Sequence, residues 1–194
     1  HEDRVTSLEN SLNKLTNNML ENKIDYSLVL TSYKVNEHRP STRQVVEAIK
    51  GRRNLGVVSG ISYLHYDHRD VREIGEYLEN GFIKALKFYP GYEPFYPNDT
   101  RLKLWFEMAI EYDVPVMFHS GDTYAPTGKV KYSHPLHIDD LAVDYPDLKI
   151  VITDTRLYIL SSSAYTRRLF EIKRHGSGRT MRALGKSSSA YPSQ

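Results

Sequence analysis

The sequence contains no cysteine among its 194 residues, and this absence excludes a whole group of sites. Neither disulfide bonds nor thiolate metal centres can form. A bound metal ion would need histidine and carboxylate ligands, which suit zinc best among the candidates, with manganese or iron as alternatives. Any metal chemistry must therefore depend on the eight histidines and the 24 acidic residues.

Long apolar segments are missing as well. No stretch approaches the roughly 20 apolar residues that cross a bilayer, and we expect no signal peptide. From these features we expect a cytoplasmic protein with no membrane partner. The 40% hydrophobic and 26% charged residues fit one ordinary globular domain.

Negative charge is scarce in the last part of the chain. Residues 1–154 carry 18 basic and 23 acidic residues, whereas residues 155–194 carry eight Lys or Arg and one acid, Glu171. The second part is rich in serine and arginine, and its composition predicts a helix over 157–172 followed by disorder. We expect a folded domain at 1–154 and a basic tail at 155–194.

Two hypotheses explain this break in composition. A reading-frame shift or truncation near Thr153 could have replaced the native continuation of the domain. Alternatively, the tail is natural and contacts nucleic acid or a partner protein. The tail shows no known nucleic-acid-binding fold, which disfavours the nucleic-acid interpretation.

Amphipathic and apolar segments alternate along residues 6–154. The apolar spacing predicts helices over 6–24, 41–49, 70–78 and 97–112, with a short one within 134–146. Buried strands are expected at 25–32, 54–62, 82–90, 114–119 and 148–154. The strands begin roughly 30 residues apart, the length of a βα unit, and their continuous apolar runs indicate a parallel sheet covered by helices.

A glycine-rich phosphate loop is also lacking after the first strand, although an open doubly wound sheet normally has one. Polar side chains follow each strand instead, as in a (β/α)8 barrel, whose active site lies at the carboxyl ends of its strands. A closed barrel needs eight strands and typically about 250 residues. We therefore predict an α/β fold that is a partial (β/α)8 TIM barrel of about five parallel strands.

Three side chains at the strand ends could carry chemistry. His119 ends the strand 114–119 and could bind a divalent cation or simply form hydrogen bonds; a metal site would need three ligands. Lys87 alternates with Leu86 and Phe88, so it could bind an acidic substrate, bear a carbamate between two metals, or extend from the outer face. Asp154 could act as a ligand or general base, or cap the next helix.

Further candidates lie in the loops. The aromatic loop 88–100 could form a substrate wall or serve as a rigid connector, and Tyr89, Tyr92 and Asp122 are our expected substrate contacts. His65, Asp67 and His68 cluster in sequence, but Asp67 or Asp70 could equally cap a helix. His134 and His137 are one helical turn apart, a spacing found in metal pairs and more often at exposed helix starts.

The segments GFIKALKFYPGYEPFYPND, VPVMFHSGDT and HPLHIDDLAVDYPDLKIVI together resemble the amidohydrolase-related family of TIM-barrel metal-dependent hydrolases, over about residues 5–153. The resemblance implies one or two divalent metals, often zinc, that activate water to attack a C–N or C–O bond of a small molecule; some relatives are decarboxylases. It also implies that the five strands are barrel strands two to six.

By this resemblance His119 matches the metal histidine of the fifth barrel strand, and Asp154 stands where the family has a sixth-strand histidine. Lys87 would orient the substrate and Asp154 would transfer protons. The HxH of the first strand and the aspartate of the eighth have no counterpart. We expect a metal-dependent hydrolase impaired in this chain, a decarboxylase relative, or a non-catalytic barrel fragment that self-associates through its open edges.

Overall fold

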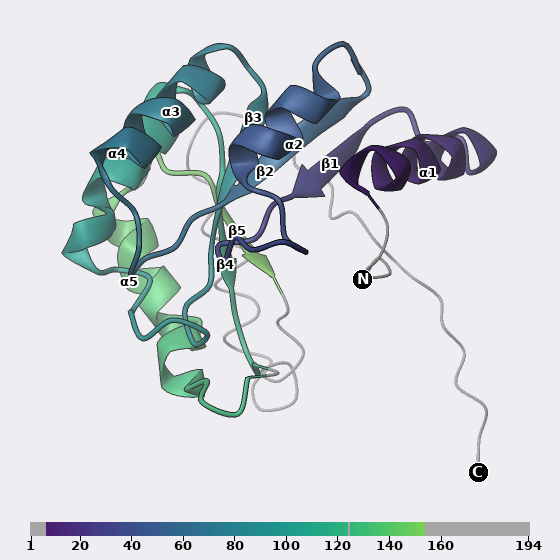
Figure 1. Ribbon diagram of the computed structural model, residues 1–194. Helices are drawn as coiled ribbons and strands as arrows, with labels where there is room; N and C mark the ends of the chain where they lie inside the picture. The colour runs from purple at the N-terminus through teal and green to yellow at the C-terminus, as the bar shows by residue number, and fades with distance from the viewer. Residues whose placement is uncertain (1–6, 124, 154–194) are drawn as a thin grey trace. The chain divides into compact units, whose positions relative to one another are not determined.

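The computed structural model describes residues 7–123 and 125–153 and contains one five-stranded sheet within them (Figure 1). All neighbouring strands are parallel and follow the chain order β1-β2-β3-β4-β5. This confirms the predicted α/β fold and parallel sheet. The strands are β1 (Ser27–Leu30), β2 (Leu55–Gly60), β3 (Ile83–Phe88), β4 (Val116–His119) and β5 (Ile150–Thr153).

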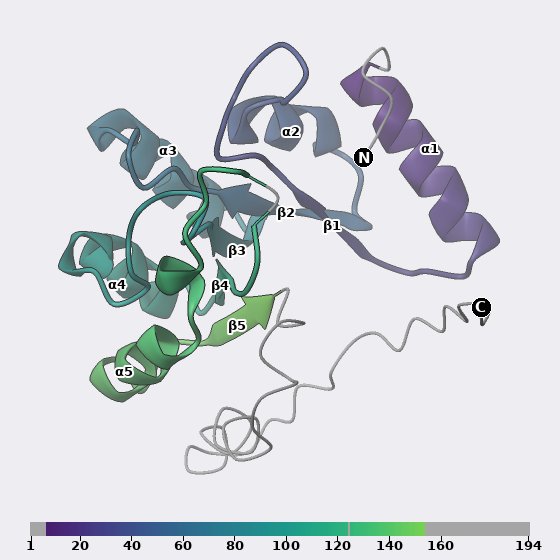
Figure 2. The ribbon, with the colours of Figure 1, turned by 90° about the horizontal axis from the view of Figure 1, so that it is seen from below.

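A helix lies between each pair of successive strands, and one more precedes β1. Figure 2 shows α2 to α5 along one side of the sheet, with α1 beside α2. The predicted helix over 97–112 begins with a 3-10 turn, so its α-helical part is shorter than expected. The helical elements are α1 (Leu8–Glu21), α2 (Thr42–Ile49), α3 (His68–Glu79), η1 (Thr100–Leu102), α4 (Lys103–Glu111), η2 (Val130–Ser133) and α5 (Leu136–Asp144).

Helix starts follow the capping chemistry visible in the sequence. At α2, the Ser41 hydroxyl accepts from the backbone N–H of Gln44, and the Gln44 side chain accepts from the Ser41 N–H. Asp67 and Asp70 form the same reciprocal pair at α3. These pairs satisfy backbone donors that have no partner within the first turn of a helix. Asp67 is therefore the cap of α3, as one of the two interpretations of its sequence position proposed.

The face of the sheet that meets the helices is aromatic. Phe88 of β3 and Phe118 of β4 are fully buried and stack with ring centroids 5.8 Å apart. Trp105 and Phe106 of α4 contact them edge to face. Burying one such side chain stabilises the fold by about 1.5–3 kcal/mol, so these contacts fix α4 on the sheet.

The opposite face, called the inner face here, carries the polar side chains. Strand register places Lys87 opposite Met117 and His119 opposite Thr153, and each alternates with a residue that points to the helices. At the β1 edge the inner face is apolar and open, since Leu28 and Leu30 are 49% and 51% exposed. A closed barrel fills its interior with such side chains. Within the described residues β1 and β5 each pair with one strand only, which agrees with a partial barrel.

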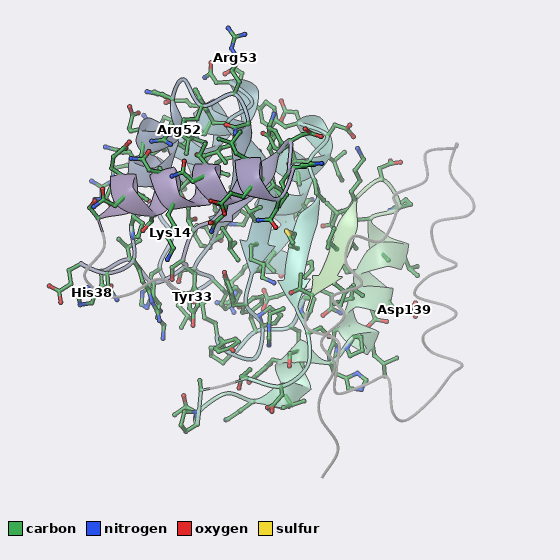
Figure 3. All side chains as sticks on the ribbon, turned by 90° about the vertical axis from the view of Figure 1, so that its right-hand side faces the viewer. Lys14, Tyr33, His38, Arg52, Arg53 and Asp139 are labelled. Atoms are coloured by element: carbon green, nitrogen blue, oxygen red, sulfur yellow. The ribbon has the colours of Figure 1, made fainter. Side chains whose placement is uncertain are left out.

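The two ends of the sheet have different surroundings. Figure 3 shows Tyr33, which follows β1, and Arg53, which precedes β2, at opposite ends of the sheet. Beside Arg53, the Arg52 guanidinium donates to the Asn13 side chain at 2.8 Å and pairs with Glu9, which holds α1 in place.

No helix in the described ranges is long and apolar enough to cross a membrane. Asp154 and the predicted tail at 155–194 lie outside the described residues.

Candidate functional site

The carboxyl ends of β3, β4 and β5 bring Lys87, His119 and Thr153 together on the inner face. Lys87 is almost fully buried, and its ammonium donates to the Thr153 hydroxyl. That hydroxyl in turn donates to the carbonyl of Phe118 at 3.1 Å. The Lys87 Nζ also lies 5.3 Å from the centre of the Tyr89 ring, within cation–π range. The Lys87 side chain therefore lies on the inner face of the sheet and does not extend from the outer face.

His119 is also buried, at the last residue of β4. Its Nε2 lies 2.8 Å from the carbonyl oxygen of Asp122. A carbonyl can only accept, so Nε2 carries the proton and donates to it. A cation at Nε2 would have to displace this bond. The Tyr92 ring lies against the imidazole, with centroids 4.8 Å apart.

Asp122 contributes to this arrangement through its main chain. Its carboxylate is exposed and accepts from the backbone N–H of Thr123 at 2.8 Å, within its own turn. Its carbonyl accepts the hydrogen bond from Nε2 of His119. The proposed contact between the Asp122 side chain and a substrate remains a prediction.

Three tyrosine rings form a row that ends at His119. The Tyr33 and Tyr89 centroids are 4.6 Å apart, and those of Tyr89 and Tyr92 are 6.3 Å apart. Tyr89 and Tyr92 were expected at the site, whereas Tyr33 was not. Its position depends on Gly60: a Cβ there would contact the Thr31 carbonyl and lie 2.9 Å from the Tyr33 nitrogen. Only the absence of a side chain lets the segment after β1 pass so close to β2.

Two further carboxylates hold the loops around this face, and neither was a candidate in the sequence. Glu93 is buried and accepts from the Ser62 hydroxyl at 2.7 Å and from the backbone N–H of Tyr63 at 3.0 Å. Asp99 accepts from the Tyr63 phenol at 2.8 Å. The loop after β2 is thus bound at two points to the loop after β3. No local pattern in the sequence indicated these partners, which lie about 30 or more positions away along the chain.

The described residues do not by themselves fit a metal ion. No group of three His, Asp or Glu side chains converges among residues 7–123 and 125–153. His65 and His68 are exposed near the capping residue Asp67. The ring of His137 packs on Tyr96 with centroids 4.3 Å apart. Burial, and then the neighbouring His137, lower the pKa of His134 below its ordinary value.

Five parallel strands with helices on the outer side, and polar side chains at the carboxyl ends, define this domain as part of a TIM barrel. Residues 39–153 match the family model described as amidohydrolase. The chain therefore belongs to the amidohydrolase family. This confirms the family resemblance drawn from the sequence.

Solved structures agree on the fold. An uncharacterised TIM-barrel protein from Bordetella bronchiseptica is 22% identical, with a TM-score of 0.55, over 73% of this chain and 50% of its own. The 5-carboxyvanillate decarboxylase of Sphingomonas paucimobilis is 13% identical, with a TM-score of 0.51, over 77% of this chain and 52% of its own. The chain thus spans about half the length of these proteins. No curated protein sequence matches it.

Proposed function

We propose that this chain carries part of the active site of a metal-dependent hydrolase that acts on a small molecule. In such a reaction water adds to a carbonyl-like carbon, the C–N or C–O bond breaks, and the leaving atom takes a proton. The main support is the meeting of His119 and Lys87 on the inner face, at the carboxyl ends of neighbouring strands in an amidohydrolase domain. Active sites of TIM-barrel enzymes are built at that end of the sheet.

Each candidate residue has a role in this proposal. Lys87 would hold an anionic group of the substrate, because its buried ammonium lies at the end of β3. Tyr89 and Tyr92 would form the wall beside it. Asp154, the residue after Thr153 in the sequence, would transfer the proton. Decarboxylation could use the same face, but the decarboxylase structure resembles this chain in fold alone, so hydrolysis remains our proposal.

When bound, a divalent metal ion, zinc above all, supplies an activated water in such enzymes. His119 is a ligand position by family resemblance, but no second and third ligand accompany it in the described part of the chain. A structural or catalytic zinc takes at least three protein ligands. We therefore expect the enzyme to be impaired in this chain.

Zinc titration of the full chain by calorimetry tests this proposal. We expect weak binding with little turnover of small amides and esters, and His119→Ala should remove the residual binding because it deletes the one family ligand among the described residues. His38→Ala, at an exposed histidine before α2, is the matched control and should bind as the parent does. Tight stoichiometric binding lost in His119→Ala would contradict the expected impairment. Binding unchanged in His119→Ala would contradict the role of the histidine.

A second function is favoured by the β1 edge, which pairs with no further strand among the residues that the structure describes. We propose that a second copy of the chain covers this edge and the apolar inner face beside it, where Leu28 and Leu30 are half exposed. An unpaired strand edge offers backbone donors and acceptors to another strand. A second copy presents the same apolar surface, so one two-fold contact would cover both.

Light scattering of the full chain tests this association. We expect a dimer whose dissociation constant rises at least tenfold in Leu30→Lys, because a charge cannot be buried in the apolar contact without a partner. Leu20→Lys, at a 74% exposed position of α1, is the matched control and should leave the dimer intact. A parent chain that stays monomeric at all concentrations would rule out the association.

A further inference from the structure

The loop that follows β3 is closed on itself by backbone hydrogen bonds around Glu93. The Glu93 N–H donates to the Tyr89 carbonyl at 3.0 Å, and the Gly91 N–H donates to the Glu93 carbonyl at 3.1 Å. Gly91 adopts the left-handed region with φ of 94°, which suits glycine. This tight loop, residues 89–93, carries both Tyr89 and Tyr92.

The Glu93 side chain leaves this loop and enters the core beside the segment that follows β2. Its Oε1 accepts from the Ser62 hydroxyl at 2.7 Å and from the Leu64 N–H at 3.2 Å. Its Oε2 accepts from the Tyr63 N–H at 3.0 Å. Three donors therefore converge on two oxygens in a buried position.

An ionised carboxylate accepts from all three donors at once. Both of its oxygens accept and neither donates, whereas a protonated carboxyl or a glutamine amide carries a donor on one side. That donor would face the Tyr63 N–H on one side of Glu93 or the Leu64 N–H on the other, and of the three partners only the Ser62 hydroxyl could turn to accept it. A buried donor turned toward another donor loses its hydrogen bond and stays desolvated, which destabilises this arrangement.

The charge on Glu93 is balanced between opposing influences. Burial raises the pKa of its carboxyl above the ordinary value, while the bonds from Ser62 and Leu64 and the nearby charges of His65 and Lys34 lower it. The same charge acts on Tyr33: burial, and then electrostatic repulsion from Glu93, raise the pKa of its phenol. The carboxylate should therefore lose its charge at a higher pH than an exposed glutamate does.

We infer that Glu93 is a positioning residue for the candidate site: its carboxylate binds residues 62–64 and thereby holds the loop 89–93 so that Tyr92 lies against His119. Tyr89 is held over Lys87 by the same loop. This inference rests on the proposed function only in taking His119 and Lys87 as the site. The placement of the rings is a property of the chain alone, without metal or substrate.

NMR of the full chain in the absence of metal tests this role. In the parent we expect the Tyr63 and Leu64 amide protons to move upfield together as pH falls through the Glu93 pKa, with the Tyr92 ring signals following the same titration. In Glu93→Gln this titration should disappear, and the His119 ring signals should shift because Tyr92 no longer packs on the imidazole. Glu76→Gln, at an exposed position of α3, is the matched control and should reproduce the parent spectra.

Two outcomes would overturn the inference. One is a folded Glu93→Gln chain whose His119 and Tyr92 signals match those of the parent. The other is a parent chain in which the Tyr92 ring does not follow the titration seen at Tyr63 and Leu64, a test that needs no variant and so holds even if Glu93→Gln does not fold. Zinc binding and turnover are measured separately, so failure of the hydrolase proposal leaves this result unaffected.

Discussion

Phe118→Ala is expected to lower the free energy of unfolding by about 3–5 kcal/mol, the range for removing a buried aromatic side chain. Phe118 is fully buried in β4, where its ring stacks on Phe88 and meets Phe106 of α4 at a centroid distance of 6.3 Å. The loss combines transfer of the ring from the core with the cavity that it leaves. Equilibrium unfolding in urea measures it, provided that the slope m stays unchanged.

A matched control lies on the exposed side of α4. Leu104 is 44% exposed, and Leu104→Ala should change the unfolding free energy by about 0.5 kcal/mol or less. A loss below about 1 kcal/mol for Phe118→Ala would contradict the packing of α4 against β3 and β4, because no well-packed aromatic residue is removed at so small a cost.

Gly60→Ala should destabilise the chain by about 1–3 kcal/mol and move Tyr33 away from Tyr89. The added Cβ would meet the Thr31 carbonyl and lie 2.9 Å from the Tyr33 nitrogen, and both are backbone atoms that can yield only if the segment shifts. Forcing an atom into such a contact has the cost typical of overpacking. Urea unfolding gives the energy, and loss of the nuclear Overhauser effect between the two rings reports the displacement.

Gly75→Ala in α3 separates this steric effect from the general effect of replacing a glycine. The nearest atom to a Cβ at Gly75 is the Met108 Cε at 3.7 Å, an ordinary contact. Alanine in a helix should then stabilise the chain by about 0.5–1 kcal/mol. Equal behaviour of the two variants would refute the close approach at Gly60.

The elements themselves could be predicted because their signals are local. Apolar runs near 55–60, 83–88 and 116–119 became parallel strands. The helix predicted over 41–49 is capped by Ser41, and of the two capping candidates Asp67 and Asp70 it is Asp67 that caps α3, which begins two residues earlier than the predicted helix. The predicted parallel sheet and partial barrel are confirmed. The single helix predicted over 97–112 differs at its start, where Asp99 caps a 3-10 turn before α4.

The candidate site was predictable only in part. His119 and Lys87 stood out because each is a polar residue at the carboxyl end of an apolar strand. In a parallel sheet all these ends lie at the same edge, so the sequence alone places the two residues near each other. Glu93 and Tyr33 carried no such signal. Their roles depend on contacts with residues about 30 or more positions away along the chain, such as Glu93 with Ser62, and no local pattern encodes them.

The sequence by itself thus determined the βα repeat and the side chains available at the strand ends, since these follow from periodicity and residue type. Its resemblance to known proteins indicated the family. Only the tertiary structure decided that Lys87 lies buried on the inner face, that Nε2 of His119 is bound to the Asp122 carbonyl, and that Glu93 holds the tyrosine loop. Burial and hydrogen-bond partners arise when distant segments pack together. These interactions therefore form only in the folded chain, and no segment of the sequence taken alone indicates them.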